Sequence, residues 1–321
     1  MPTIYLHCGA PKTGTSYMQV LFAKHSDDLV GQNIIYPNNA FVTGAKEGKI
    51  TSGNGVEMAN YIRPELPHRI ADKTGFIDDF DRLLAQGDGV NFLFSSEFLV
   101  FPENERTSCL VKLISRRGYD VKVIYLVRDL VNAALSTYSQ QVKRGGETRV
   151  FEEFLKTWNP HYTHHTNLLR ASFGAEAVSI YNYEEHKKDL PKLFFEKFLG
   201  CQIDVESKEV VNRSLSPKEL ELLRTFSEYT GDSNAYASTF VSDALMRLTA
   251  AEPSDNIIGR QEYNYLSERY AQSIDKINQI IIGQKIRISS GYQEELPKFE
   301  LNDFERFTMA VLAKLVVAKN N

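Results

Sequence analysis

The stretch that decides the fold is residues 4–24, which read IYLHCGAPKTGTSYMQVLFAK. Residues 4–8 form a short, mostly apolar run that ends at a glycine, and this pattern predicts a buried strand. Residues 15–24 carry apolar side chains at helical spacing and predict a helix. The chain therefore begins with a strand, a tight loop at 9–14 and a helix.

The loop has the spacing of a phosphate-binding loop. Gly9 and Gly14 are five positions apart, and the hydroxyl residues Thr15 and Ser16 follow. Such a loop directs backbone N–H groups at a helix N-terminus, which binds anions. A Walker A loop has its lysine directly after the second glycine, whereas this chain has it earlier, at Lys12. The displacement disfavours a nucleoside triphosphate ligand, and the alternative is a plain strand-to-helix turn with an exposed lysine.

Further strands and helices alternate along the chain. Strands are predicted at 91–95, 121–127 and 177–181, and helices at 103–117, 129–144, 151–157 and 189–199. Strands that alternate with helices indicate a parallel sheet covered on both faces. The sequence thus predicts an α/β fold: a P-loop-like three-layer domain with a central parallel sheet and a helical C-terminal extension.

The domain boundary is predicted near residue 215. Residues 1–215 are expected to form the core, with a partly ordered insertion rich in glycine and asparagine at about 38–75. Residues 216–321 are expected to form a helical extension packed on that core. Its helices are predicted near 217–229, 239–250, 262–281 and 302–318, and the first begins at a typical Ser-Pro start signal.

Charge and cysteine content limit the class of protein. The chain has 37 Lys and Arg against 41 Asp and Glu, a formal net charge of -4, which argues against a nucleic-acid partner. The three cysteines, Cys8, Cys109 and Cys201, suit neither a disulfide framework nor zinc spacing and fit a reducing compartment. Since neither a signal peptide nor a transmembrane segment is evident, we expect a cytoplasmic protein; the sequence gives no basis for an oligomeric state.

Residues Pro11, Lys12, Thr13, Gly14, Thr15 and Ser16 resemble a known motif. They are similar to the loop that binds the 5′-phosphosulfate in sulfotransferases dependent on 3′-phosphoadenosine-5′-phosphosulfate (PAPS). The wider run 7–16 is similar to bacterial members of that family. The resemblance implies that these six residues bind PAPS, the donor cosubstrate, and that no metal is required.

Two further segments carry the resemblance. In that family a strand ends in an arginine, and a serine eight positions later joins it on the 3′-phosphate; Arg128 and Ser136 match this spacing. Tyr183, in a Tyr-Glu pair after a strand, would lie near the adenine. The alternatives are a salt bridge for Arg128, for instance to Asp129, a backbone-bonded helix serine for Ser136, and a core tyrosine at the sheet edge for Tyr183.

The resemblance implies two catalytic residues. Lys12 would neutralise charge on the leaving phosphate oxygen. Glu97, which closes the strand at 91–95, is predicted to accept the proton of the acceptor. Alternatively, Glu97 only holds Lys12 or a helix N-terminus in place. His161, His164 and His165 are expected to lie at the surface or to line the acceptor site rather than to bind a metal.

We therefore expect an enzyme, a PAPS-dependent sulfotransferase that acts on a hydroxyl or amine of a small-molecule or glycan acceptor. The acceptor class that we favour is a carbohydrate or glycoconjugate. The run Tyr138–Lys143 is similar to bacterial carbohydrate-type members. Lys143 and Arg144 fit the end of a helix dipole or an anionic acceptor. The alternatives are a P-loop kinase or NTPase, and a non-catalytic nucleotide- or glycan-binding module on the same fold.

Overall fold

The computed structural model describes residues 1–49, 51–65, 75–87, 89–205, 215–231, 235–247, 258–289, 291–294 and 300–320. The chain divides into two compact units. The first comprises Met1–Asp129, His161–Glu206 and Gln272–Ile286. The second comprises Leu130–Pro160, Ser207–Ala271 and Arg287–Asn321.

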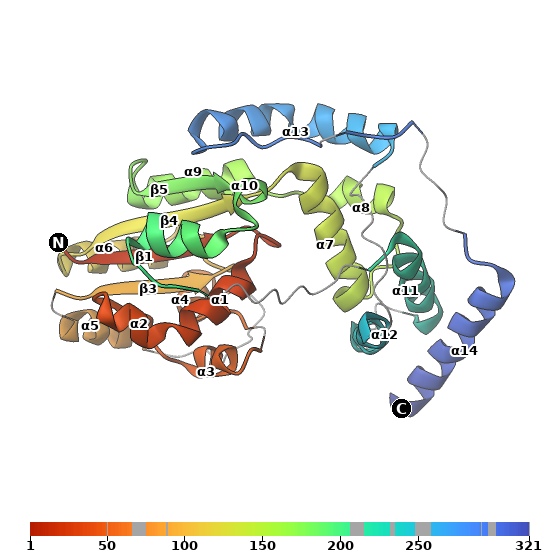
Figure 1. Cartoon of the computed structure of the whole chain (residues 1–321), viewed down its shortest axis with the longest axis horizontal. Helices are drawn as coiled ribbons and strands as arrows, with labels where there is room; N and C mark the ends of the chain where they lie inside the picture. Colours follow the sequence, from red (N-terminus) through yellow and green to blue (C-terminus); the bar gives the residue numbers. More distant parts are fainter. Residues whose placement is uncertain are drawn as a thin grey trace. The chain divides into compact units, whose positions relative to one another are not determined.

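A parallel five-stranded sheet in the order β2-β3-β1-β4-β5 forms the centre of the first unit (Figure 1). The strands are β1 (Thr3–Gly9), β2 (Ile34–Ile35), β3 (Asn91–Ser96), β4 (Asp120–Val127) and β5 (Val178–Asn182). In the middle of the sheet, Leu6 of β1 pairs with Phe94 on one side and Val123 on the other. Because the strands are parallel, their carboxyl ends meet at one edge, which brings together the phosphate loop, Glu97 and Arg128.

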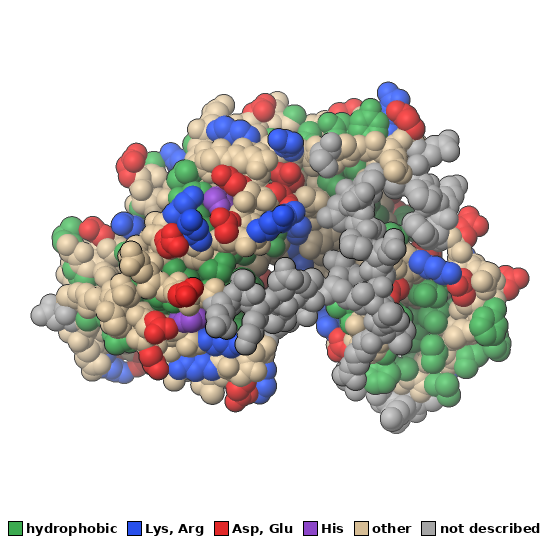
Figure 2. Space-filling model, viewed as in Figure 1, with side chains coloured by type: hydrophobic (Ala, Val, Ile, Leu, Met, Phe, Trp, Pro, Cys, Tyr) green, Lys and Arg blue, Asp and Glu red, His purple; other side chains and the backbone are tan. Residues whose placement is uncertain are grey.

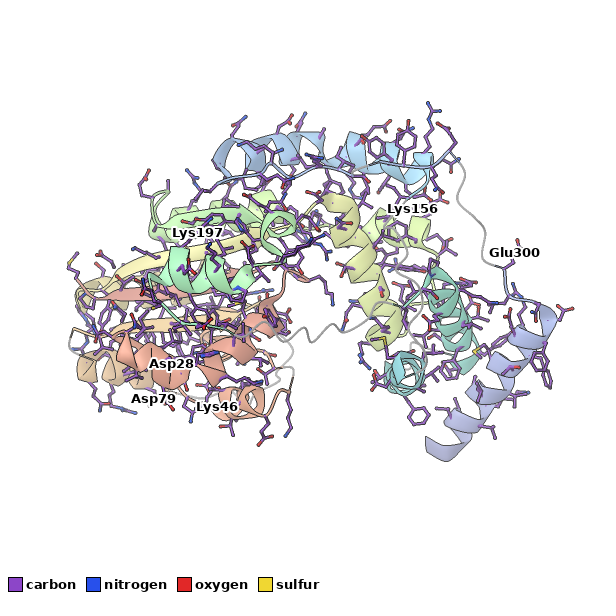
Figure 3. All side chains as sticks on the ribbon, viewed as in Figure 1. Asp28, Lys46, Asp79, Lys156, Lys197 and Glu300 are labelled. Carbon is purple, nitrogen blue, oxygen red and sulfur yellow. The ribbon has the colours of Figure 1, made fainter. Side chains whose placement is uncertain are left out.

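One face of the sheet is covered by α1 (Thr15–Lys24), α2 (Ser26–Gly31), α3 (Ala40–Lys46) and the π-helix η1 (Lys192–Leu199). Phe22 of α1 and Phe194 of η1 lie edge to face, with ring centroids 5.6 Å apart, and both are fully buried. In Figure 3 the label Lys197 identifies η1, which lies in front of the sheet. The apolar residues of these four helices thus form one core with the strands.

The opposite face is covered by α5 (Phe76–Gln86), α6 (Glu105–Arg116) and α9 (Tyr162–Phe173), with α4 (Val56–Ile62) beside α5 and α6. Alternation along β3 directs Phe94 to this face, where its ring lies 5.6 Å from that of Phe80. The short helix α10 (Tyr183–His186) follows β5 directly. The predicted three-layer α/β architecture with a parallel sheet is therefore confirmed.

Helix α4, like α3, lies inside the region that the sequence marks as an insertion at 38–75. The loop between these two helices returns to the sheet through Gly53, Asn54 and Gly55, and Gly55 N donates to Ser95 O over 3.1 Å. The described part of this region thus contains two helices, and the loop between them is tied to β3. Residue 50 and residues 66–74 lie outside the described residues.

The second unit is helical. It contains α7 (Leu130–Gly145), α8 (Phe151–Thr157), α11 (Pro217–Thr230), α12 (Ala235–Arg247), α14 (Asp303–Asn320) and the first part of α13 (Arg260–Ile280). α11 packs on α14, α12 and α7. It begins with a complete capping box, in which Ser216 and Glu219 each bond the other's backbone N–H. Figure 2 shows hydrophobic side chains at the surface over α11 and α14. Phe304 and Phe307 of α14 are among the exposed hydrophobic residues.

The two units divide the chain differently from the predicted boundary at 215. Leu130–Pro160 belongs to the second unit because α7 packs against α8, α11 and α12. Conversely, Gln272–Ile286 belongs to the first unit, where Ile282 N donates to Ile180 O of β5 over 2.8 Å. A division into 1–215 and 216–321 remains a prediction about how the chain is organised.

Candidate active site

The phosphate loop adopts the left-handed backbone that its sequence allows. Gly14 has φ 79° and directly precedes α1, and Lys12 has φ 68°, an uncommon value for a residue with a side chain. The hydroxyl of Thr13 donates to Ala10 O over 2.7 Å and closes the loop on itself. An added Cβ at Gly9 would lie 2.2 Å from Oγ1 of Thr15. The loop therefore requires glycine at both predicted positions.

Lys12 interacts electrostatically with two predicted site residues of opposite charge. Burial of its ammonium group lowers the pKa of Lys12, repulsion from Arg128 lowers this pKa further, and attraction to Glu97 acts in the opposite direction. The residue as a whole keeps an exposed surface at the loop. The ends of β1, β3 and β4 thus bring Lys12, Glu97 and Arg128 within electrostatic reach of one another.

Arg128 is anchored from two sides. Its Nε donates to Oε1 of Glu184 over 2.7 Å, and its Nη1 donates to Lys12 O over 3.2 Å. Both side chains of the ion pair are largely buried, with 14% and 10% of their surface exposed. Burial alone would raise the pKa of Glu184, but the hydrogen bond and charge of Arg128, helped by Lys187, hold it below its usual value. Arg128 therefore forms a buried ion pair with Glu184.

Tyr183 packs beside the loop and the arginine. The guanidinium carbon of Arg128 lies 5.0 Å from the centroid of the Tyr183 ring, a cation–π distance. A Cβ added at Gly14 would lie 3.3 Å from Cε2 of the same ring. Burial raises the pKa of the Tyr183 phenol, while Arg128 acts in the opposite direction. Tyr183, which is predicted to lie near the adenine, is thus close to Gly14 and Arg128, which are predicted to bind the phosphates.

The end of β3 carries the candidate base. His7 and Ser95 face each other across β1 and β3, and His7 Nδ1 lies 2.9 Å from Ser95 Oγ. His7 is fully buried against Phe22 and Phe194, and burial lowers its pKa from 6.5 to about 3. A neutral imidazole therefore fixes the strand two residues before Glu97.

Ser136 belongs to a different unit from the other predicted PAPS-binding residues. It lies on α7, eight residues after Arg128, and α7 is part of the second unit. Its pairing with Arg128 on a 3′-phosphate stays a prediction. The segment Asn212-Arg213-Ser214, which is similar to a loop in bacterial family members, lies outside the described residues.

Two residues near the site were not assigned a role from the sequence. Glu184 belongs to the Tyr-Glu pair and forms an ion pair with Arg128. The sequence signal for this pairing is an acidic residue directly after a strand. Asn54 bonds to the backbone of β3 near Glu97. Its only sequence signal was its place between two glycines, Gly53 and Gly55.

The three clustered histidines gather at the start of α9. The ring centroids of His161, His164 and His165 lie 5.6 to 6.4 Å apart. Burial lowers the pKa of His165 to about 4, with further lowering by the other two histidines and by Arg63. Within the part of the chain that the structure describes, no three or more His, Cys, Asp or Glu side chains are grouped so that they could hold a metal ion.

A cavity of about 600 Å³ lies in the second unit. Its lining residues are polar or charged for the most part: Gln141, Gly145, Gly146, Glu147, Thr148, Arg149, Ser227, Glu228 and Gly231. None of the predicted site residues is among them. At the end of α7, Arg144 pairs with Asp243 over 2.7 Å, so this cation serves contacts within the second unit. Across the described ranges, no helix is long and apolar enough to cross a membrane.

Comparison with known proteins identifies a family. The sulfotransferase domain family matches residues 107–287, more than half of the chain. This stretch contains Arg128, Ser136 and Tyr183, whereas the phosphate loop and Glu97 precede it. None of the curated proteins compared with the chain matches it.

Several solved structures are similar to this chain at low sequence identity. A sulfotransferase from Alicyclobacillus acidocaldarius is 19% identical, with 78% of this chain and 97% of that chain covered and a TM-score of 0.38. Retinol dehydratase in a complex with retinol and PAP is 16% identical, with 87% and 81% covered and a TM-score of 0.36. A mouse sulfotransferase complexed with PAP is 16% identical, with 86% and 83% covered and a TM-score of 0.33.

Proposed function

The chain belongs to the sulfotransferase domain family, and on this premise we propose that its donor is PAPS and that its acceptor is a carbohydrate or glycoconjugate. The observation that carries the proposal is the convergence of Lys12, Arg128 and Tyr183 on one phosphate loop. Family membership favours sulfuryl transfer over the kinase or NTPase alternative, as does the position of Lys12 before Gly14.

The 5′-phosphosulfate is proposed to bind at the loop 11–16. The start of α1 offers backbone N–H groups and the positive end of a helix dipole. Lys12 adds a cation, and Thr15 adds a hydroxyl whose Oγ1 has no hydrogen-bond partner among the described residues. Pro11, Thr13, Gly14 and Ser16 complete the proposed site, with Thr13 and Gly14 setting the shape of the loop.

The 3′-phosphate is proposed to bind Arg128 and Ser136, and the adenine to lie near Tyr183. A guanidinium group can hold two phosphate oxygens at once. The bond from Nε to Glu184 and the packing on the Tyr183 ring fix the plane of the Arg128 guanidinium before any ligand arrives. Such fixed donors lose little conformational entropy when an anion binds.

The transfer needs two charge movements. The acceptor oxygen or nitrogen attacks sulfur, and the bond from sulfur to the bridging phosphate oxygen breaks. We propose that Glu97 takes the acceptor proton and that Lys12 neutralises the charge left on the phosphate oxygen of the product, adenosine 3′,5′-bisphosphate. All of these groups come from the protein, so the proposal requires no metal.

The acceptor proposal rests on the similarity of Tyr138–Lys143 to carbohydrate-type bacterial members. Retinol dehydratase is described in complexes with retinol and with androsterone, so acceptors of other chemical classes belong in the test panel. We further propose a cytoplasmic, bacterial-type enzyme without a nucleic-acid partner. The net charge of -4 and the free cysteines Cys8, Cys109 and Cys201 support that setting.

Calorimetric titration without metal tests the donor. Adenosine 3′,5′-bisphosphate is expected to bind about 30- to 150-fold more tightly than 5′-AMP, since the added charge-assisted hydrogen bonds contribute about 2–3 kcal/mol. Arg128→Ala should remove this preference. Arg117→Ala is a matched control because the Nε of Arg117, like that of Arg128, donates to a carboxylate, here that of Asp81. Equal binding of the two nucleotides would overturn the proposed 3′-phosphate site.

A sulfuryl-transfer assay with radiolabelled PAPS tests the reaction and the acceptor. Oligosaccharides, a steroid, retinol and an arylamine form the panel, and product is expected with the oligosaccharides. Transfer to the steroid alone would contradict the carbohydrate acceptor but keep the enzyme class. Tight bisphosphate binding without transfer to any acceptor would favour the non-catalytic binding module.

A further inference from the structure

Among the described residues, the outer edge of β3 has a strand partner only at its first two residues. Strand β2 pairs only through Ile34 with Asn91 and through Ile35 with Phe92. The backbone groups of β3 that follow therefore need other hydrogen-bond partners, because unpaired buried backbone groups are costly. These groups lead directly to Glu97.

The side chain of Asn54 supplies the missing partner. Its Nδ2 donates to Leu93 O over 2.9 Å, and its Oδ1 accepts from Ser95 N over 2.8 Å. A carboxamide has the same donor and acceptor groups as a peptide, so Asn54 replaces one residue of a neighbouring strand. The contact is interior, since Asn54 is only 5% exposed.

The segment Gly53–Gly55 packs so closely on β3 and the residues after it that side chains larger than glycine at positions 53 and 55 would clash. A Cβ at Gly53 would lie 2.0 Å from Ser95 O, and one at Gly55 would lie 2.9 Å from Cδ1 of Leu99. Gly55 N donates to Ser95 O. Because His7 holds the Ser95 side chain from β1, the strand end is fixed on both sides.

We propose that Asn54 is a positioning residue for Glu97: it holds the end of β3 so that the Glu97 carboxylate reaches the acceptor proton beside Lys12. This inference rests on the proposed function, in which Glu97 is the base. Asn54 itself does not touch the reacting atoms. A base displaced by about 1 Å loses on the order of 100-fold in rate, so the bonds of Asn54 to β3 are expected to matter for the chemical step.

The test compares Asn54→Ala with Asn104→Ala. Asn104 is a matched control, since it also donates to a backbone oxygen, that of Ile62, and accepts from a backbone nitrogen, that of Thr107, both over 2.8 Å. Asn54→Ala is expected to lower kcat by about 10- to 100-fold and to leave the affinity for adenosine 3′,5′-bisphosphate within about threefold. Asn104→Ala is expected to keep kcat within about threefold at a temperature where both variants are folded.

A double variant separates positioning from general stability. If Asn54 acts through Glu97, the variant with both Asn54→Ala and Glu97→Gln has the same kcat as Glu97→Gln alone. Multiplying effects, or equal losses of kcat in Asn54→Ala and Asn104→Ala, would overturn the inference. If Asn54→Ala does not fold, Asn54→Asp retains the acceptor for Ser95 N and removes the donor to Leu93 O, and the same comparisons apply.

The outcomes also separate this inference from the proposed function. No transfer by the wild-type chain, with any acceptor, would contradict the proposed function itself. Undiminished kcat in Glu97→Gln would remove the base and this inference together, while the PAPS site would stand on the binding data. Transfer that depends on Glu97 but not on Asn54 would overturn only the positioning role.

Discussion

Replacement of His7 is expected to change how the stability of the first unit depends on pH. The imidazole has a pKa of about 3 in the folded chain because it is buried, against 6.5 for an ordinary histidine. Between pH 3 and pH 6.5 the unfolded chain binds the proton at His7 and the native chain does not. The contribution of His7 to the free energy of unfolding is therefore fully present above pH 6.5 and is lost as pH falls toward 3. One pKa unit corresponds to about 1.4 kcal/mol, so acidification from pH 7.5 to 5 should cost about 2 kcal/mol through His7 alone.

The assay is urea unfolding of the wild-type chain and His7→Gln at pH 7.5 and pH 5. Far-UV circular dichroism is recorded together with hydrogen exchange of β1 amides, because the only tryptophan, Trp158, lies in the second unit. The loss of stability between the two pH values should be about 2 kcal/mol smaller in His7→Gln. Ser95→Ala should keep the full loss, since burial and not the hydrogen bond lowers the pKa of His7. An equal loss in wild type and His7→Gln would refute the reasoning.

Three further perturbations have defined outcomes. At Gly14 the backbone has φ 79° and an added Cβ would lie 2.6 Å from Cδ1 of Leu190, whereas Gly118 has φ 73° and open space around it. The left-handed backbone alone should cost Gly118→Ala about 1–2 kcal/mol of stability. Thermal unfolding should therefore show a larger drop in Tm for Gly14→Ala than for Gly118→Ala. Burial, and then repulsion from Arg128, lower the pKa of Lys12. Calorimetry should therefore show that the affinity for adenosine 3′,5′-bisphosphate falls as pH rises, beginning below pH 10.5. Lys12→Ala should flatten this dependence. Ser216→Ala removes a capping box and should cost about 1 kcal/mol in urea unfolding followed by tryptophan fluorescence, with Ser216→Thr close to wild type; an unchanged midpoint in Ser216→Ala would contradict the role of the cap.

Local patterns predicted the elements that are strongly periodic or bounded by clear signals. The helix at 15–24 and the helix at 151–157 were predicted to the residue, because each combines helical apolar spacing with a defined start. The ends of the predicted strands differ from those observed by at most one residue. Strand β2 was missed, since two residues carry no detectable period. Helix α9 was missed because its polar, histidine-rich start hides the buried face formed by Tyr162, Leu168 and Leu169.

The candidate site was predictable where one loop carries the chemistry and less so where partners come from distant segments. Lys12 and Gly14 stand in a compact motif, and their local spacing fixes their geometry. The pair of Arg128 with Glu184 joins residues 56 positions apart, and the bonds of Asn54 reach 39 and 41 positions along the chain. Such contacts depend on the order of strands in the sheet, which no single stretch of sequence specifies.

The covered edges of the sheet at β3 and β5 also affect whether the protein aggregates in solution. An exposed strand edge is a template for pairing with another chain and a route to aggregation. Here the outer edge of β3 beyond its pairing with β2 is occupied by Gly53–Gly55 and the carboxamide of Asn54, and among the described residues the edge at β5 is covered by a bridge from Tyr181 to Ile282. Loosening either cover, for example by Gly53→Val, is expected to free backbone groups for edge-to-edge association. The contacts that we propose to position Glu97 are therefore also expected to keep separate molecules from joining their sheets.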